Sequence, residues 1–408
     1  MVRMDTSNGS PLQDVIQLDV GKGFDLLDGI RVLDLTTSIA GPYATMLLSD
    51  FGAEVIKIER PEGDDARHWG PPFLDGVGLW FLSVNRNKKS VVLDLTTQRG
   101  RDNLFSLVRT SDVVVSNQPV SVQRKLGLTM EDFRKVNPNI IMTSITGFGL
   151  SGARADLTCY DLIAEGHSGI MDVTGTAESD PQKVGAPAAD MLAGQDAAMA
   201  TLAALFDRNR KCRGHQIDVA LAESMTRFLT CRISSYMGSG EVPKRSGGTD
   251  SVIAIYQSFE TADFPITLGI GTDAIWSRFW TAMAQPEYAL DPTYGSNVKR
   301  RANRRQIISD IQKLLRCKSR EHWLAVFAAA RVPAGPINSV DQVVADIDFQ
   351  ERGMIAALHE GGRVTPHVGL GIQIDQTCAT PRSTAPRLGA DTEAVLADVR
   401  THVSGNHS

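Results

Sequence analysis

Asp190 is an acidic residue whose position could serve either structure or chemistry. It ends the segment Gly185–Asp190, and the Ala-rich stretch that follows, 191–206, is predicted to be helical. Asp is among the preferred N-cap residues, so position alone predicts that Asp190 caps this helix. A helix N-terminus also favours the charged form of a carboxylate, and carboxylates in that form can act as nucleophiles. The two roles are compatible.

Several common catalytic and cofactor-binding motifs are absent from the sequence. No Gly-x-Gly-x-x-Gly follows the first predicted strand, and there is no P-loop. The sequence also lacks a Gly-x-Ser-x-Gly elbow and histidine pairs at metal-ligand spacing. The five cysteines are scattered without a Cys-x-x-Cys pair, a pattern that favours a reducing cytoplasm. We therefore expect no metal centre and a cytoplasmic location.

Charge and hydropathy argue against two classes of partner. The formal net charge is -5, whereas nucleic-acid-binding proteins usually carry a basic excess. The longest nearly apolar run, Ala197–Phe206, is about half as long as a membrane span requires. The N-terminal residues have no apolar signal core. We expect neither nucleic acid nor membrane as a partner.

The predicted elements alternate between short β-branched strands and helices, which is typical of an α/β fold with a parallel sheet. After a flexible N-terminal extension, 1–25, a large Rossmann-like domain is predicted over 26–237. A Gly/Ser/Pro-rich stretch then begins a smaller α+β domain, 238–345, and 346–408 is predicted to return to the large domain. The strands expected in the large domain are 30–36, 55–59, 91–95, 113–116, 140–146 and 216–220.

Six short blocks in order give the sequence a family resemblance. Together they resemble the class III coenzyme A transferases (CaiB/BaiF type), over about residues 29–400. That family includes formyl-CoA:oxalate transferase, carnitine CoA-transferase and the α-methylacyl-CoA racemases. The blocks are Ala40–Pro42, Glu54–Pro61, Gly63–Phe73, Asn85–Ser90, Tyr160–Ala164 and Val332–Pro336.

The resemblance implies a reaction and a nucleophile. Asp190 matches the family's catalytic aspartate, which attacks an acyl-CoA thioester to give a mixed anhydride and then an aspartyl-CoA thioester. A free carboxylic acid finally takes the CoA, and neither ATP nor a metal is needed. Blocks 63–73 and 85–90 are most similar to members acting on small dicarboxylates, such as succinate–hydroxymethylglutarate CoA-transferase. The family's interlocked homodimer is also implied.

The resemblance also assigns binding roles. Arg60 ends a predicted strand at the carboxyl edge of the sheet, where such sheets bind ligands, and it matches a CoA-binding arginine. Lys88 and Lys89 are further cationic candidates for the CoA phosphates, alongside the solvated-surface interpretation. The other positions that match CoA contacts are Ala40, Leu93, Asn117, Lys125 and Leu126.

The substrate side is expected to involve Tyr160, Asp161 and the loop glycines Gly247 and Gly248, which are candidate oxyanion donors. Arg67 or Arg86 could bind a distal carboxylate, although an ion pair of Arg67 with Asp64 or Asp65 is the favoured interpretation. Tyr160 stands where the racemase branch has a proton-shuttling histidine, which favours transfer over racemisation. Racemisation, another CoA-thioester isomerisation, or CoA binding without catalysis are the alternatives.

Overall fold

The computed structural model describes residues 10–250 and 252–405, and these form two compact units. The first unit combines the described parts of Met1–Ile170, Lys183–Ser239 and Val344–Ser408; the second combines Met171–Gln182 with the described part of Gly240–Val343. Residues 171–182, which the sequence assigns to the large domain, thus lie in the second unit. They are held there because the Gly175 carbonyl accepts the Gly247 N–H at 2.8 Å and Asp172 pairs with Arg245 at 3.0 Å.

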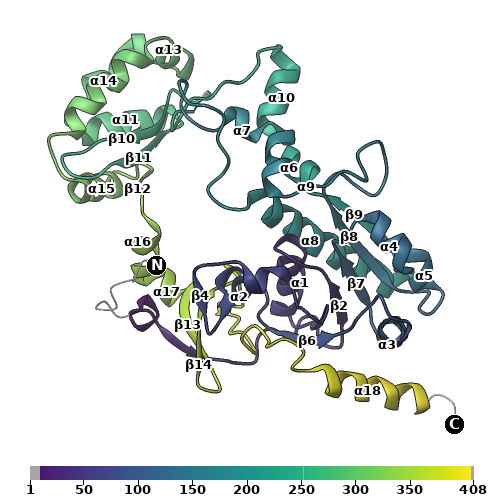
Figure 1. Ribbon diagram of the computed structural model, residues 1–408. Helices are drawn as coiled ribbons and strands as arrows, with labels where there is room; N and C mark the ends of the chain where they lie inside the picture. Colours follow the sequence, from purple (N-terminus) through teal and green to yellow (C-terminus); the bar gives the residue numbers. More distant parts are fainter. Residues whose placement is uncertain (1–9, 251, 406–408) are drawn as a thin grey trace. The chain divides into compact units, whose positions relative to one another are not determined.

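A six-stranded parallel sheet forms the centre of the first unit, in the order β6-β3-β2-β7-β8-β9 (Figure 1). This is the doubly wound order. The chain adds strands toward one edge of the sheet from β2 to β6 and toward the other edge from β7 to β9, so the strand order reverses between β2 and β7. The predicted α/β fold with a parallel sheet is confirmed. The strands are β2 (Arg31–Leu35), β3 (Glu54–Glu59), β6 (Lys88–Val92), β7 (Val113–Ser116), β8 (Ile141–Thr146) and β9 (Gln216–Ala220).

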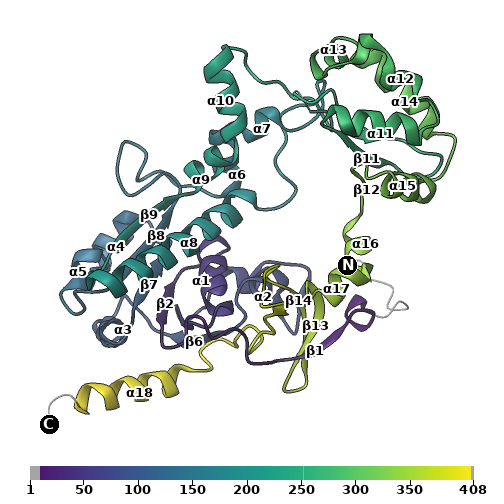
Figure 2. The same ribbon diagram turned by 180° about the vertical axis from the view of Figure 1, so that it is seen from behind.

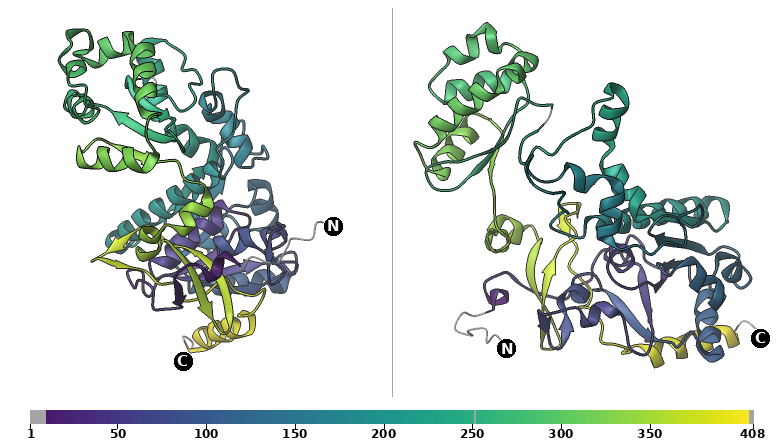
Figure 3. Two further views of the ribbon diagram at one scale, coloured as in Figure 1. Left: turned by 90° about the vertical axis from the view of Figure 1, so that its left-hand side faces the viewer. Right: turned by 45° about the horizontal axis from the view of Figure 1, so that its top comes forward.

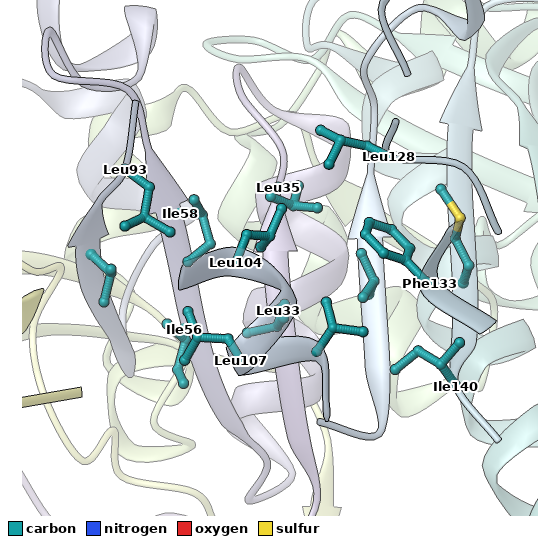
Figure 4. Close-up of a cluster of buried hydrophobic side chains, with 14 of the residues drawn as sticks. Leu33, Leu35, Ile56, Ile58, Leu93, Leu104, Leu107, Leu128, Phe133 and Ile140 are labelled. Atoms are coloured by element: carbon teal, nitrogen blue, oxygen red, sulfur yellow. The ribbon is translucent and has the colours of Figure 1, made fainter. Parts of the chain in front are cut away.

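Helices cover both faces of this sheet. Alternate residues of a strand point to opposite faces, so Leu33 and Ile56 meet one layer while Val32 and Val55 meet the other. On the first face, Leu104, Leu107 and Phe133 pack against the strands in one buried apolar cluster (Figure 4). The helices on this face are α3 (Gln98–Arg109), α5 (Met130–Arg134) and α18 (Thr392–Gly405).

On the other face, α1 (Ala40–Asp50) packs against α8 (Ala188–Lys211) (Figure 2). The backbones of the two helices lie close together at Gly194. A Cβ atom at this position would lie 2.7 Å from the Ala40 carbonyl oxygen and 2.9 Å from Tyr43 Cδ1. Glycine is therefore required for the close approach of the two backbones.

The variant Gly194→Val is expected to lower the free energy of unfolding by about 1–3 kcal/mol, because the added side chain must push α1 away from α8. Urea unfolding of the purified protein measures this change. Ala203→Val, on the exposed side of the same helix, is the matched control and should have little effect. An unchanged stability of Gly194→Val would mean that the α1–α8 contact is looser than described.

The N-terminal segment joins the fold earlier than expected. Strand β1 (Gln17–Asp19) pairs in parallel with β13 (Ile355–Glu360), whose other neighbour is β14 (Arg363–Val368). The prediction of a flexible extension over 1–25 does not hold for β1, because its backbone supplies the hydrogen bonds that an edge strand would otherwise leave unpaired. Residues 1–9 of that extension lie outside the described residues.

The second unit has its own core, drawn in green in Figure 3. Strands β10 (Ile255–Phe259), β11 (Ile266–Ile270) and β12 (Ala334–Pro336) form an antiparallel sheet. Apolar side chains from the helices, including Trp276, Phe279 and Phe327, pack against it. Its helices are α11 (Asp273–Ala282), α12 (Glu287–Leu290), α13 (Asn297–Ala302), α14 (Arg304–Leu315) and α15 (Arg320–Ala329).

The remaining elements connect these layers or extend them. Within the described ranges, no helix has the length and apolarity needed to cross a membrane. The connecting elements are the short 3-10 helices Pro11–Gln13, Asp65–His68 and Pro292–Tyr294, β4 (Phe73–Leu74), β5 (Val77–Gly78), α2 (Leu79–Ser83), α4 (Val120–Leu126), α6 (Asp161–Ser168), α7 (Ile170–Val173), α9 (Leu221–Phe228), α10 (Thr230–Ser239), α16 (Val340–Ala345), α17 (Ile347–Glu351), β15 (Gln373–Ile374) and β16 (Thr377–Cys378).

Candidate active site

A pocket of about 290 Å³ opens at the carboxyl ends of β2, β3 and β6. Its position beside the reversal of strand order is where doubly wound sheets bind ligands. Part of the pocket wall is apolar. Leu93 and Leu126, which are predicted CoA contacts, lie in this apolar part. The apolar lining residues are Leu35, Ile58, Leu93, Leu95, Val122 and Leu126.

Arg60 lies at the same pocket. Its Nε donates to the Gly63 carbonyl at 3.0 Å, and its guanidinium pairs with Asp65. The side chain is 54% exposed, so the guanidinium can exchange Asp65 for another anion at small cost. The structure thus brings a solvent-accessible positive charge and an apolar slot together, which suits a phosphate-bearing nucleoside.

Asn117 joins the two strands at which the strand order reverses. Its Oδ1 accepts the Thr37 N–H at 3.0 Å and its Nδ2 donates to the Thr37 carbonyl at 2.8 Å. Both ends of the amide are therefore engaged with the backbone after β2, and Asn117 fixes the rim of the pocket. Ala40 is the first residue of α1, whereas Lys125 is exposed on α4 and is not among the residues that line this pocket.

A buried ion pair supports the turn between β2 and α1. The Nζ of Lys57 donates to the Thr36 carbonyl at 2.8 Å and lies 2.9 Å from Asp64 Oδ2. The other oxygen of Asp64 accepts the N–H of Ser38 at 3.1 Å, and Ser38 has a left-handed φ of 70°. Because Lys57 and Asp64 are fully buried, each needs the other's charge, and together they hold the turn that borders the pocket.

The cations proposed for substrate carboxylates are already paired. The guanidinium of Arg67 donates to Glu59 at 2.6 and 2.7 Å, and Arg86 binds Asp50 at 2.6 and 2.9 Å. All four side chains are buried, so removing either arginine would leave an uncompensated charge. The expectation that Arg67 binds substrate is therefore not supported by its position, and its partner is Glu59 rather than Asp64 or Asp65.

Two lysines of β6 are also occupied elsewhere. Lys88 is buried, and its Nζ lies 2.9 Å from Asp34 and 2.8 Å from the Pro42 carbonyl. Lys89 pairs with Glu54 at 2.6 Å. The strand was predicted to begin at Val91, but it begins at Lys88. The buried ion pair with Asp34 allows this charged residue to join the sheet.

The N-terminus of α8 is capped by a side chain from another helix. The helix begins at Ala188, so Asp190 lies within its first turn and is not its N-cap as predicted; the preceding Pro187 supplies no side-chain cap. Asp161, the first residue of α6, provides the cap instead. Its Oδ1 accepts the backbone N–H of Ala189 at 2.8 Å and of Asp190 at 3.2 Å.

This arrangement changes the charge expected on Asp190. Burial, together with the nearby charge of Asp161, raises the pKa of the Asp190 carboxyl to about 7. The sequence-based argument that the helix end would favour the charged form is therefore outweighed by desolvation. Neighbouring Cys159 is affected in the same direction, since burial and then Asp190 raise the pKa of its thiol to about 11.

Glu165 is a site residue that the sequence analysis missed. It is completely buried in α6, and its Oε2 accepts the N–H of Val184 at 2.8 Å. Burial is the main cause of the raised pKa of its carboxyl, and Asp161 adds to the effect. The available signal was its spacing, because residues i and i+4 of a helix share a face and Glu165 follows Asp161 by four.

A second pocket of about 460 Å³ is lined in part by residues that precede and follow Asp190 in the sequence. Pro187 and Met191 form part of its wall, with Tyr43 of α1 and Trp80 of α2. This mainly apolar space offers room for an acyl group near the start of α8.

The structure also describes the surroundings of Tyr160, Gly247 and Gly248. Tyr160 is 68% exposed, and its side chain does not cap α6. Gly247 and Gly248 belong to the second unit. The N–H of Gly247 is already donated to Gly175, so it is not available as an oxyanion donor in this arrangement. The described part of the chain has no cluster of three or more His, Cys, Asp or Glu that could hold a metal.

Comparison with known proteins gives a consistent result over most of the chain. Residues 27–392 match the profile of CoA-transferase family III. The sequence is 39% identical to a succinate–glutarate CoA-transferase from Agrobacterium fabrum over 92% of this chain and 96% of that protein. It is 35% identical to a succinyl-CoA:mesaconate CoA-transferase from Haloarcula hispanica over 89% of this chain and 93% of that one. The crystal structure of a CaiB/BaiF family protein from Brucella suis superposes with a TM-score of 0.81 at 36% identity, covering 91% of this chain and 99% of that one.

Proposed function

This chain belongs to CoA-transferase family III and is a CoA-transferase, and we propose that it moves CoA between small dicarboxylates through a covalent intermediate on Asp190. The observation that carries the proposal is the acid in the first turn of α8, with backbone N–H groups held by Asp161 and a pKa of about 7. A carboxylate with that pKa is ionised in part at neutral pH and is a stronger nucleophile than an ordinary aspartate. The names of relatives from Agrobacterium fabrum and Haloarcula hispanica support dicarboxylate substrates.

The proposed reaction proceeds by two exchanges at one carboxyl group. An oxygen of Asp190 attacks the thioester carbonyl, the carbon–sulfur bond breaks, and CoA leaves as a thiolate from an aspartyl–acyl anhydride. The thiolate then attacks the Asp190 carbonyl carbon, which releases the donor acid and leaves CoA on Asp190 as a thioester. The acceptor carboxylate attacks this thioester, and the same two steps in reverse deliver the new acyl-CoA. Bonds and charges balance without an added energy source or metal.

The pocket at the carboxyl ends of β2, β3 and β6 is the proposed CoA site. Leu93 and Leu126 would flank the adenine, and Arg60 would bind a phosphate in place of Asp65. Asn117 would act indirectly by holding Thr37. Contacts of Ala40 and Lys125 with CoA, and of Tyr160, Gly247 and Gly248 with substrate, stay predictions.

Replacing Arg60 with alanine is expected to raise the KM for acyl-CoA by about tenfold with little change in kcat, since a charge-assisted phosphate contact made equally throughout the reaction is lost. Steady-state kinetics with varied acyl-CoA measure the effect. Arg316→Ala removes an exposed arginine of the second unit and is the charge-matched control. A fall in kcat at constant KM would contradict a binding role.

A homodimer is part of the proposal. Large apolar side chains are exposed on α8, α9 and α10, including Met199 at 59%, Phe228 at 62% and Met237 at 78%. Exposed apolar side chains grouped on neighbouring helices are typical of protein interfaces, and a second copy is the partner implied by the family resemblance. Sedimentation or light scattering tests this state. The cytoplasmic location stays a prediction.

The function is tested by incubating the protein with succinyl-CoA and a panel of dicarboxylates, including glutarate and mesaconate, and by chromatography of the thioesters formed. Formation of a new dicarboxyl-CoA is the expected result. In deuterated water the α-carbon of the acyl group should gain no deuterium, whereas a racemase or isomerase of CoA thioesters would incorporate it. Incorporation without transfer would overturn the proposal.

A further inference from the structure

Two carboxyl groups lie one helical turn apart on α6 and meet behind the first turn of α8. Asp161 caps the backbone at Ala189 and Asp190, as described above. Glu165 is fully buried and follows Asp161 by four residues, so the two side chains share a face of α6. Two ionised carboxylates offer only acceptors, so they cannot hydrogen-bond to each other. A hydrogen bond between these two acids therefore needs a proton on one of them.

The hydrogen-bond partners indicate which acid keeps it. Asp161 already accepts two backbone N–H groups, which stabilise its charged form. Glu165 accepts only the Val184 N–H, through Oε2. Its Oε1 is buried and has no hydrogen-bond partner among the described residues, so a proton on the Glu165 carboxyl would allow this group to donate to Asp161. Burial favours the neutral form of this group.

We propose that Glu165 is a positioning residue for CoA transfer, which retains its proton, donates it to Asp161, and so holds Asp161 against the first turn of α8. Asp161 in turn fixes the backbone that carries Asp190. The inference rests on the proposed role of Asp190 as nucleophile and adds a residue that does not itself touch the substrate.

The charges around this pair are few, which makes the role specific. Glu165 is faced by Asp161 from its own helix and by the charge of Lys183 from the segment before α8. Asp190 is faced by Asp161, and the thiol of Cys159 lies near both. A protonated Glu165 adds no charge that would hinder ionisation of Asp190. It supplies only the hydrogen bond that orients Asp161.

Two substitutions of Glu165 test whether it acts as a neutral hydrogen-bond donor or as a charged group. Glu165→Gln keeps a donor for Asp161 and an acceptor for Val184 without a titratable proton, so it should retain the wild-type rate and pH midpoint of kcat/KM. Glu165→Met keeps the volume but removes the donor, and its kcat should fall by about 10- to 100-fold, because Asp190 is no longer held in its reactive geometry. Its pH midpoint should move to lower pH, since Asp161 is free to turn away from Asp190.

The experiment measures kcat, the pH dependence of kcat/KM, and the circular dichroism spectrum of both variants with succinyl-CoA and an accepted dicarboxylate. Glu131→Gln, an exposed glutamate in the first turn of α5, is the matched control. A Gln variant as slow as the Met variant, or with a midpoint displaced to lower pH, would show that Glu165 acts as an anion and would overturn the proposal. Wild-type kinetics of a folded Met variant would overturn it as well. If Glu165→Met does not fold, the rate and midpoint of the Gln variant decide alone.

Trapping the intermediate separates failure of this inference from failure of the proposed function. Mass spectrometry of the peptide that contains Asp190 reports how fast the CoA adduct forms. If the adduct forms on Asp190 at the wild-type rate in Glu165→Met, the positioning role is wrong and the nucleophile is retained. If wild-type protein turns over while no adduct ever forms on Asp190, the proposed mechanism itself is wrong.

Discussion

Replacement of Asp190 by alanine is expected to lower the rate of CoA transfer by about 10⁴-fold or more, because the variant lacks the carboxyl on which the proposed covalent intermediate forms. The neighbouring thiol is a poor substitute, since burial and Asp190 raise the pKa of Cys159 to about 11 and leave very little thiolate at neutral pH. Asp161 is engaged by two backbone N–H groups. The loss should appear in kcat, and binding of CoA should persist because the pocket at Arg60 is unchanged.

The measurement is steady-state transfer from succinyl-CoA, together with equilibrium binding of CoA. Asp207→Asn is the matched control, since Asp207 lies on the same helix and pairs with Lys211 at 2.7 Å near its other end. A transfer rate of Asp190→Ala close to that of the control would exclude Asp190 as the nucleophile. Retained rate with normal CoA binding would mean that a group other than Asp190 carries the reaction.

The fold could be predicted from the sequence where each strand carries its own pattern. Val113–Ser116 begins with three consecutive β-branched valines and Gln216–Ala220 follows a polar turn, and both strands have the predicted bounds. The strand at Lys88 was predicted to begin three residues late because a lysine rarely enters a buried strand. Its charge is balanced by Asp34, 54 residues earlier, and a partner at that separation leaves no local signal.

Some residues of the candidate site could also be predicted from the sequence, and others could not. Arg60 could be placed because it directly follows a strand, and the carboxyl ends of parallel strands meet at one edge. The partner of Arg86 could not be predicted, since Asp50 is 36 residues away along the chain. The partner of Arg67 could not be predicted either, since burial selects Glu59, eight residues earlier, over the nearer Asp64 and Asp65. The cap of α8 is another such case. An acid at the start of a helix suggests that this acid is the N-cap, yet the cap comes from Asp161, and only the three-dimensional structure shows that the Asp190 side chain is not used for it.

The rate of transfer is expected to depend on pH through Asp190. Its pKa is raised to about 7 and the nucleophile must be ionised, so kcat/KM should fall about tenfold for each pH unit below that value and level off above it. The stability of the fold has the opposite trend. The ordinary pKa of 3.8 lies below the folded-state value of about 7, so the native state binds more protons and loses stability as pH rises between these values. Asp190→Asn should therefore have a higher Tm than wild type at alkaline pH. Near pH 3.8 the two proteins should have a similar Tm.

Asp161→Asn separates the titration of Asp190 from that of the CoA phosphates. The amide oxygen can still accept the two N–H groups of α8, but the negative charge that helps to raise the pKa of Asp190 is removed. The midpoint of kcat/KM should consequently move to lower pH, whereas a midpoint set by the substrate's own phosphate cannot respond to a change in the protein. Profiles of the variant and wild type with one acyl-CoA give the comparison. An unmoved midpoint would mean that Asp161 does not influence the group whose ionisation controls the reaction. A shift to higher pH would also contradict the assignment, because removing a negative charge lowers the pKa of a neighbouring group.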